Sequence, residues 1–192
     1  MNMDFVPTPS QTAGPFLRIG LTDKCSIVQI APPGTKGERV LLKCRVLDVE
    51  GTPINDAMIE IWQADAEGKY NHPDDPQGTS RDGSFHGFGR AASDENGNCE
   101  FETIKPGPVP GADGSLQAPH LNVAIFGRGI LLQLHTRIYF AGDPANDHDP
   151  VLALVPVERR DTLLAQPDPA HTGTWNFEFH LRGERETIFF DI

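Results

Sequence analysis

Hydrophobic and polar residues alternate in short runs along most of the chain after residue 38. A two-residue period, typical of strands with one buried face, covers 40–49, 57–62, 99–104, 120–126, 131–140, 174–181 and 186–190. Turn residues separate these runs, most clearly at 50–53 and 94–98. Only 155–165 has the pattern of a helix, and it is short. We predict an all-β fold, a β-sandwich with long decorated loops and one short helix near the C-terminal third.

The first 37 residues lack this alternation. Prolines and glycines interrupt them at Pro9, Gly14, Pro15 and 32–34, which disfavours a regular helix or a central strand. We therefore divide the chain into an irregular N-terminal arm, 1–37, and a β-sandwich domain, 38–192. We expect the arm to become ordered by packing on a partner chain. A second long segment rich in Gly, Asp and His, 66–96, has the length of a functional or contact-forming loop.

Composition narrows the possible partners. The chain has 192 residues, 38% of them hydrophobic, and a net charge of −11. An acidic protein without Lys/Arg clusters is unsuited to nucleic acid or an anionic membrane. We expect no signal peptide and no membrane span, because neither a basic, apolar start nor an apolar run of about 20 residues occurs. Cys25, Cys44 and Cys99 form no Cys-x-x-Cys site, and their odd number fits a reducing compartment. We predict a cytoplasmic protein.

Three segments carry the residues of greatest chemical interest. They are EIWQADAEGKY at 60–70, IKPGPVP at 104–110 and APHLN at 118–122. Together these segments resemble the intradiol ring-cleaving dioxygenases, and most closely the protocatechuate 3,4-dioxygenases. In the catalytic chains of that family, two tyrosines and two histidines bind Fe(III). One tyrosine ends the Trp-Gln-Ala-Asp segment, the second follows Lys-Pro-Gly, and the histidines form a His-x-His pair on a later strand.

Half of that ligand set is present here. By the resemblance, Tyr70 and His120 stand at ligand positions, whereas Val109 replaces the second tyrosine and Asn122 the second histidine. Valine has no ligating atom, and a carboxamide is a poor ligand for a hard trivalent ion. Gln117 stands where catalytic chains carry an arginine that helps to stabilise ionised substrate. We interpret Tyr70, Val109, His120 and Asn122 as vestigial iron positions. We predict no metal and no catalytic residue in this chain alone.

Other segments resemble the non-catalytic chain of heteromeric protocatechuate dioxygenases. They are 8–16 in the arm, 125–130, and the C-terminal 183–192. In the family, the arm and the Gly-Arg-Gly turn lie at the mouth of the partner's iron pocket. The resemblance therefore implies that Thr12, Gly14, Pro15 and Arg128 contribute to the substrate pocket of a neighbouring chain. Phe16 stands where relatives often carry tyrosine, so a hydrogen bond from that hydroxyl is absent.

The resemblance implies a hetero-oligomeric enzyme with a homologous catalytic beta chain that binds Fe(III). An aromatic 1,2-diol would chelate that iron and react with O₂, so that the ring opens between the hydroxylated carbons. From protocatechuate the product would be 3-carboxy-cis,cis-muconate. The present chain would act as the iron-free alpha chain, forming one side of the pocket and much of the assembly interface.

Alternatives remain open. Tyr70 could be a stacking residue, His120 a core histidine, and 135–137 a half-buried strand with outward polar side chains. The other histidines, at 72, 86, 148, 171 and 180, have no ligand-pair spacing. A stand-alone dioxygenase with an atypical metal site at Tyr70 and His120 would reveal itself by iron analysis of the isolated chain. A non-enzymatic β-sandwich binding module is the third possibility.

Overall fold

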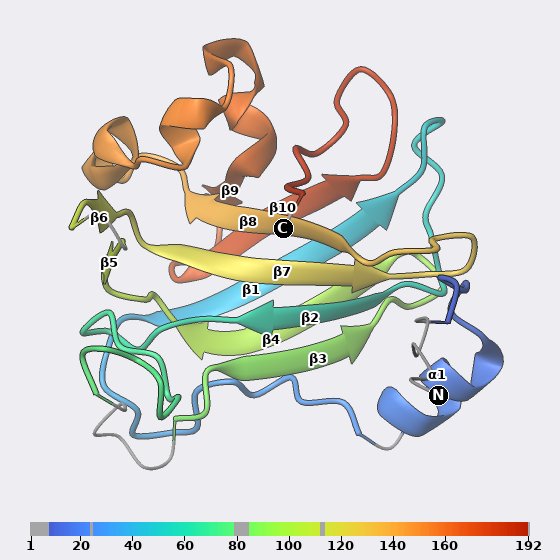
Figure 1. Ribbon diagram of the computed structural model, residues 1–192, viewed down its shortest axis with the longest axis horizontal. Coiled ribbons are helices and arrows are strands. Elements are labelled where there is room, and N and C mark those ends of the chain that lie inside the picture. The colour runs from blue at the N-terminus through green and yellow to red at the C-terminus, as the bar shows by residue number, and fades with distance from the viewer. Residues whose placement is uncertain (1–7, 24, 79–84, 112–113, 192) are drawn as a thin grey trace, which may run out of the picture.

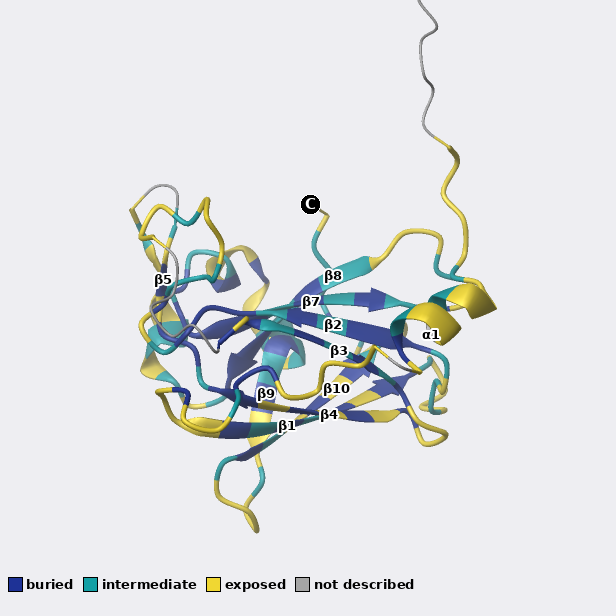
Figure 2. Ribbon diagram, turned by 90° about the horizontal axis from the view of Figure 1, so that it is seen from below, coloured by how far each residue is buried: buried dark blue, intermediate teal, exposed yellow. Residues whose placement is uncertain are grey.

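The computed structural model describes residues 8–23, 25–78, 85–111 and 114–191 (Figure 1). Eight strands form one continuous sheet in the order β3-β2-β7-β8-β9-β10-β1-β4, which doubles over into the two layers seen in Figure 2. The β1–β10 and β8–β9 pairs are parallel and the others antiparallel. The strands are β1 Arg39–Leu47, β2 Met58–Trp62, β3 Phe88–Ala92, β4 Asn98–Ile104, β7 His120–Phe126, β8 Leu134–Phe140, β9 Leu164–Pro167 and β10 Thr174–His180.

The core lies between the two layers, and strand alternation explains it. On β2 and β7 the residues of one parity are buried, while Glu60, Trp62 and Asn122 on the other parity face outward and are only partly buried. The core side chains from the two layers include Ile59, Ile61, Leu121, Val123 and Ile125 on one side and Leu42, Val46, Phe101, Phe177 and Phe179 on the other. The predicted all-β architecture is confirmed, and the strand at 120–126 has the predicted bounds.

The short helix predicted at 155–165 is present as a 3₁₀ helix, η3 Val157–Leu163, that leads into β9. Three other local predictions are wrong. The 66–96 loop contains strand β3. The last predicted strand, 186–190, forms only an isolated bridge between Phe190 and His135. The arm, expected to be irregular, contains the helix α1 Pro15–Leu21. Proline is favoured at the first position of a helix, where its missing N–H is not needed, so Pro15 begins α1 and does not break it.

Short elements complete the fold. A two-stranded ribbon, β5 Val109–Pro110 with β6 Leu116–Gln117, lies at the start of β7, and the 3₁₀ helices η1 Pro144–His148 and η2 Leu152–Leu154 follow β8 (Figure 1). At the opposite end of β7 lies α1. This arrangement places the vestigial iron positions at one end of β7 and the turn with Arg128 at the other.

The arm is not uniform. Residues 1–7 lie outside the described part of the chain. Ile30 and Ala31 belong to the core of this domain, and Ile27 and Gln29 form bridges with Arg90 and Glu102. By contrast, Phe16 and Ile19 on α1 are 84% and 57% exposed. The part of the arm that remains available to a partner is thus its N-terminal half, and packing of the arm on another chain stays a prediction.

Within the described ranges, no helix is long and apolar enough to cross a membrane.

Candidate functional site

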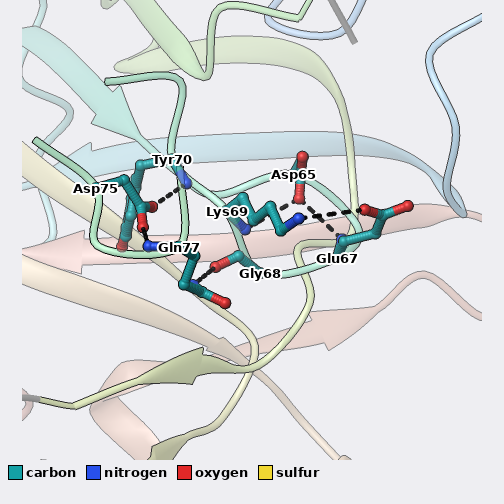
Figure 3. A network of polar contacts seen from close by, with 7 residues as sticks. All are labelled: Asp65, Glu67, Gly68, Lys69, Tyr70, Asp75 and Gln77. Carbon is teal, nitrogen blue, oxygen red and sulfur yellow. Dashed lines mark hydrogen bonds and ion pairs between the residues drawn. The ribbon is translucent and has the colours of Figure 1, made fainter. Parts of the chain in front are cut away.

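The loop after β2 holds Tyr70 in place through local hydrogen bonds (Figure 3). Asp65 Oδ1 accepts hydrogen bonds from the backbone N–H groups of Glu67, at 2.9 Å, and Lys69, at 3.0 Å. Asp75 then accepts from the backbone N–H groups of Tyr70 and Gln77, both at 2.7 Å. A carboxylate that accepts several backbone N–H bonds stabilises a tight turn. These two aspartates therefore fix the backbone from which the Tyr70 side chain extends.

Two glycines bring the Lys-Pro-Gly segment against this loop. Gly68 has a φ of +80°, and a Cβ there would collide with the carbonyl oxygen of Pro108. A Cβ on Gly107 would lie 2.5 Å from the carbonyl oxygen of Ala66, and the Gly107 N–H donates to Asp65 O at 2.8 Å. Only glycine permits this backbone approach. The contact places Val109 next to the Tyr70 loop and explains why the two segments carry glycine.

Gln63, the second residue of the Trp-Gln-Ala-Asp segment, connects the two layers. It is completely buried, and its Nε2 donates to the carbonyl oxygens of Ala64 and Ile104, both at 3.0 Å. Its Oε1 accepts a 2.5 Å hydrogen bond from Thr103 Oγ1. A buried carboxamide with all these partners satisfied holds the end of β2 to β4, so the motif residue is structural here.

Tyr70 and Asn122 are in direct contact. Asn122 Nδ2 donates a 3.0 Å hydrogen bond to Tyr70 Oη and a longer one, 3.4 Å, to the carbonyl oxygen of Trp62. The Tyr70 ring lies parallel to Trp62, with centroids 6.0 Å apart. Burial raises the pKa of Tyr70, although the hydrogen bond from Asn122 lowers it in part. The phenol is therefore kept protonated, whereas a ligand for Fe(III) must be a phenolate.

His120 is buried, with 1% of its surface exposed. Its Nδ1 lies 2.7 Å from the carbonyl oxygen of Ala118, which fixes the tautomer with the proton on Nδ1. Its Nε2 is buried and has no hydrogen-bond partner among the described residues. Burial, together with the nearby Arg137 charge, lowers the pKa of His120 to about 4. The imidazole is thus neutral and offers one lone pair, the state that a metal ligand requires.

The four vestigial iron positions do not fit Fe(III) as a set. They offer one imidazole lone pair, one protonated phenol already hydrogen-bonded to Asn122, one amide and the apolar, buried Val109. Fe(III) prefers several anionic or imidazole donors around one point. Among the described residues, no group of three or more His, Cys, Asp and Glu side chains is placed to hold a metal. The absence of iron from this chain stays a prediction, now with a chemical reason.

Arg137 is the residue at this end of β7 that the sequence analysis missed. The segment 135–137 is part of a strand, as expected, and Thr136 is buried. Arg137, however, donates from Nη1 to Gln117 Oε1 at 2.7 Å and to Tyr139 Oη at 3.3 Å. A positive charge therefore stands beside position 117, supplied by β8. The signal was available, because a 120–126/134–140 hairpin places Arg137 opposite Asn122.

The residues predicted to contribute to a partner's substrate pocket lie together at the other end of β7. We call Thr12, Gly14, Pro15 and Arg128 the arm–turn cluster. Thr12 Oγ1 accepts a 2.7 Å hydrogen bond from the Gly129 N–H, which ties the arm to the turn after β7. Arg128 is 79% exposed, and its Nε lies 2.9 Å from Asp56 Oδ2. The cluster is open to solvent, with space around Gly14.

Comparisons with known proteins agree with this geometry. A family model described as Dioxygenase matches residues 14–183. The protocatechuate 3,4-dioxygenase alpha chain of Pseudomonas putida is 38% identical over an alignment of 206 residues that covers all of both chains. The alpha chain from Burkholderia cepacia is 40% identical over 198 residues, covering 96% of this chain and 97% of that one. The beta chain from Burkholderia cepacia is 34% identical, over 79% of this chain and 67% of its own length.

Solved structures share the fold. The dioxygenase domain of a dioxygenase–carbohydrate-binding fusion protein from Streptomyces sp. SirexAA-E is 25% identical, with a TM-score of 0.62 over 93% of this chain and 99% of that domain. The 3-chlorocatechol 1,2-dioxygenase of Rhodococcus opacus 1CP has a TM-score of 0.64 over 93% of this chain and 68% of its own. With the full-length match to the alpha chains, these findings show that the chain belongs to the intradiol dioxygenase family.

Proposed function

We propose that this chain is the iron-free alpha chain of a protocatechuate 3,4-dioxygenase and assembles with a homologous catalytic beta chain into a hetero-oligomer. Fe(III) bound by the beta chain would be chelated by the two ring oxygens of the substrate and would make the resulting diolate reactive toward O₂. Protocatechuate then takes up both oxygen atoms and becomes 3-carboxy-cis,cis-muconate. The observation that carries this proposal is the pair of opposite ends of β7: a closed, ligand-poor site at one end and an exposed arm–turn cluster at the other.

The arm–turn cluster suits one side of a partner's pocket. Arg128 is exposed and engages a carboxylate, Asp56, through Nε, so the outer edge of its guanidinium can meet the ring carboxylate of protocatechuate. Gly14 has open space around it, which lets the backbone of the arm approach a ligand closely. The exposed Phe16 and Ile19 beside it provide apolar surface for the partner chain.

The cysteines support assembly in a reducing cytoplasm. Cys44 and Cys99 are directly paired across β1 and β4, both are buried, and both are free thiols. A hydrogen bond with Cys99, together with burial, raises the pKa of Cys44 well above its usual range. Two free thiols in contact are typical of a protein that lives where disulfides do not form.

Co-expression with the homologous catalytic chain tests the proposal. The complex should contain one iron per chain pair, show the red-brown tyrosinate-to-iron colour, and consume one O₂ per protocatechuate. The chain expressed alone should contain no stoichiometric iron and cleave no catechol. Stoichiometric iron with activity in the chain alone would favour a stand-alone dioxygenase instead. Failure to bind the catalytic chain at all would favour a separate binding module.

A further inference from the structure

A cavity of about 440 Å³ lies on the outer face of the layer that contains β2, β3, β7 and β8. Strand register builds its floor. Phe88 on β3, Trp62 on β2, Asn122 on β7 and Arg137 on β8 are directly paired in sequence along one row across the four strands. Directly paired residues point to the same face of a sheet, so this row places two aromatic rings, an amide and a guanidinium side by side.

The C-terminal segment and a 3₁₀ region border the cavity. Phe190 and Asp191 line it together with Val151. The Phe190 N–H donates to the carbonyl oxygen of His135 at 2.7 Å, so the tail is held against β8. The remaining lining is mixed, with the apolar Ile61, Val123 and Ala124 and the polar Glu60, His135 and Thr136. The result is a broad slot with aromatic surface at one side and Arg137 at the other.

The charges in this slot leave one cation without a carboxylate. Glu60 is paired with Arg90, with Oε1 2.6 Å from Nη2. Arg137 donates only to the neutral oxygens of Gln117 and Tyr139, and no carboxylate of the described residues lies within ion-pair distance of it. Of the other titratable groups in the lining, His135 is half-buried and Asp191 is exposed. A half-buried guanidinium with unused donors is a favourable anchor for an anion.

We propose that this cavity is a second, metal-free binding site for a planar aromatic carboxylate. The carboxylate accepts hydrogen bonds from the Arg137 guanidinium, and the ring lies against Trp62 and Phe88, whose centroids are 6.5 Å apart. No bond is made or broken there, because no described residue of the slot is an activated nucleophile and the vestigial iron positions do not fit iron. The proposal rests on the residues that line this slot and does not depend on the function proposed above.

The test uses the assembled complex, with and without iron, and 4-fluorobenzoate as the probe. Titration followed by fluorine NMR counts the binding sites, and the visible iron band reports which fraction of the binding occurs at the metal. We expect one site per chain pair that leaves the band unchanged and that persists after iron is removed. Benzamide, which lacks the charge, should not occupy this site, and cyclohexanecarboxylate, which lacks a flat ring, should bind more weakly.

Variants of this chain identify the residues. Arg137→Gln should weaken the iron-independent site by roughly ten-fold or more, because it removes a charge-assisted pair of hydrogen bonds. Trp62→Leu keeps the charge and should weaken it less. Arg182→Gln, which removes an exposed arginine outside the cavity lining, is the matched control and should change nothing.

Two results would overturn the proposal. One is a wild-type complex in which all 4-fluorobenzoate binding perturbs the iron band and disappears with the iron, as would happen if a segment of the partner filled the slot. The other is an iron-independent site whose affinity is the same in wild type, Arg137→Gln and Trp62→Leu. If the variants fail to assemble, the same titration of wild type with benzamide and cyclohexanecarboxylate still decides whether charge and ring are recognised.

Discussion

The two ends of β7 show how one strand can be adapted in opposite directions. At its start, His120 is buried and Asn122 is half-buried, and His120 Nδ1, Tyr70 Oη and Gln117 Oε1 each have a hydrogen-bond partner within the chain. Beyond its end, Arg128 is exposed, and helix α1 of the arm exposes the apolar side chains of Phe16 and Ile19. The seven residues of β7 separate these regions by roughly 20 Å. Under the proposed function, the hydrogen bonds within the chain take the place of a metal site at one end, and the exposed residues at the other end form a surface for a partner.

The largest expected effect comes from restoring metal ligands at the start of β7. Val109→Tyr with Asn122→His restores two donors next to Tyr70 and His120 and should give weak iron uptake with a faint tyrosinate-to-iron band. Adding Arg137→Gln should strengthen uptake, because the guanidinium repels a trivalent cation. Metal analysis and visible spectra of the folded variants check this. Asn122→His alone, which leaves Val109 in place, is the control, and a triple variant that binds no more iron than wild type would show that the frame has changed too far.

Binding of the partner chain should be more sensitive to loss of apolar surface at the exposed end of β7 than elsewhere on the chain. Leu131 and Leu132, in the turn before β8, are 59% and 67% exposed. If the partner covers them, Leu131→Ser with Leu132→Ser should raise the Kd of the chain pair by roughly a hundred-fold or more, since burying each leucine contributes about 1.5–3 kcal/mol. Analytical ultracentrifugation measures this. Leu154→Ser is the control, because it removes a leucine that is even more exposed, at 82%, and that lies in η2 and not in this turn.

If the Leu131→Ser/Leu132→Ser variant and the Leu154→Ser control weaken the chain pair equally, or if neither weakens it, the exposed end of β7 is not the partner surface. In the same experiment, the unpaired chain should aggregate more readily than the complex, because α1 then exposes Phe16 and Ile19.

The closed end should make stability depend on pH through His120. Its pKa is lowered to about 4 in the fold, against about 6.5 when unfolded. The unfolded state therefore binds the proton first, and the stabilising contribution, complete above pH 6.5, is lost as the pH falls toward 4. Between pH 7 and pH 5 the loss is about 2 kcal/mol. We therefore expect the Tm of the chain in the complex to be lower at pH 5 than at pH 7 by roughly 4–8 °C.

His120→Leu cannot titrate at this position, so its Tm should fall less over the same pH range, whatever its Tm at pH 7. Parallel Tm curves for the variant and the wild type would show that another group is responsible.

The smallest effect concerns substrate choice at the open end. Arg128→Ala should lower kcat/KM for protocatechuate by about ten-fold and leave catechol, which has no carboxylate, nearly unchanged. Asp56→Asn is the matched variant, because it frees the guanidinium without removing it. Steady-state kinetics on the complex with iron content measured checks both. Equal losses on the two substrates would assign Arg128 to the interface and not to the ring carboxylate.

Sequence reasoning found the elements whose burial is local and missed those set by distant contacts. The strand at 120–126 was predictable because its alternation is regular. Strand β3 was not predictable from its own sequence, because it contains Gly89. A glycine is needed there for a tertiary contact, since a Cβ would lie 2.6 Å from the Ile30 side chain. The helix α1 does not emerge from the sequence pattern, because a proline disfavours a helix interior, whereas Pro15 occupies the first helical position, where proline is favoured.

The site shows the same division. The positions that we interpret as vestigial were visible as motif residues, and Tyr70 and Asn122 are hydrogen-bonded to each other. Arg137 was missed because nothing in its own neighbourhood marks it. Its role depends on the register that places it opposite Asn122 and on Gln117, 20 residues earlier, as a hydrogen-bond partner.

The hydrogen bond between Asn122 and Tyr70 has a consequence for how the protein is supplied in the cell. A chain whose core site is completed by a metal gains stability by mass action and unfolds more readily when that metal is scarce. Here Tyr70 is held by Asn122 and Asp75, and Val109 is apolar and buried, so under the proposed function we expect folding to require no ion. The concentration of folded chain should then be independent of iron nutrition, and under iron shortage the supply of iron-loaded catalytic chain should set how much complex forms.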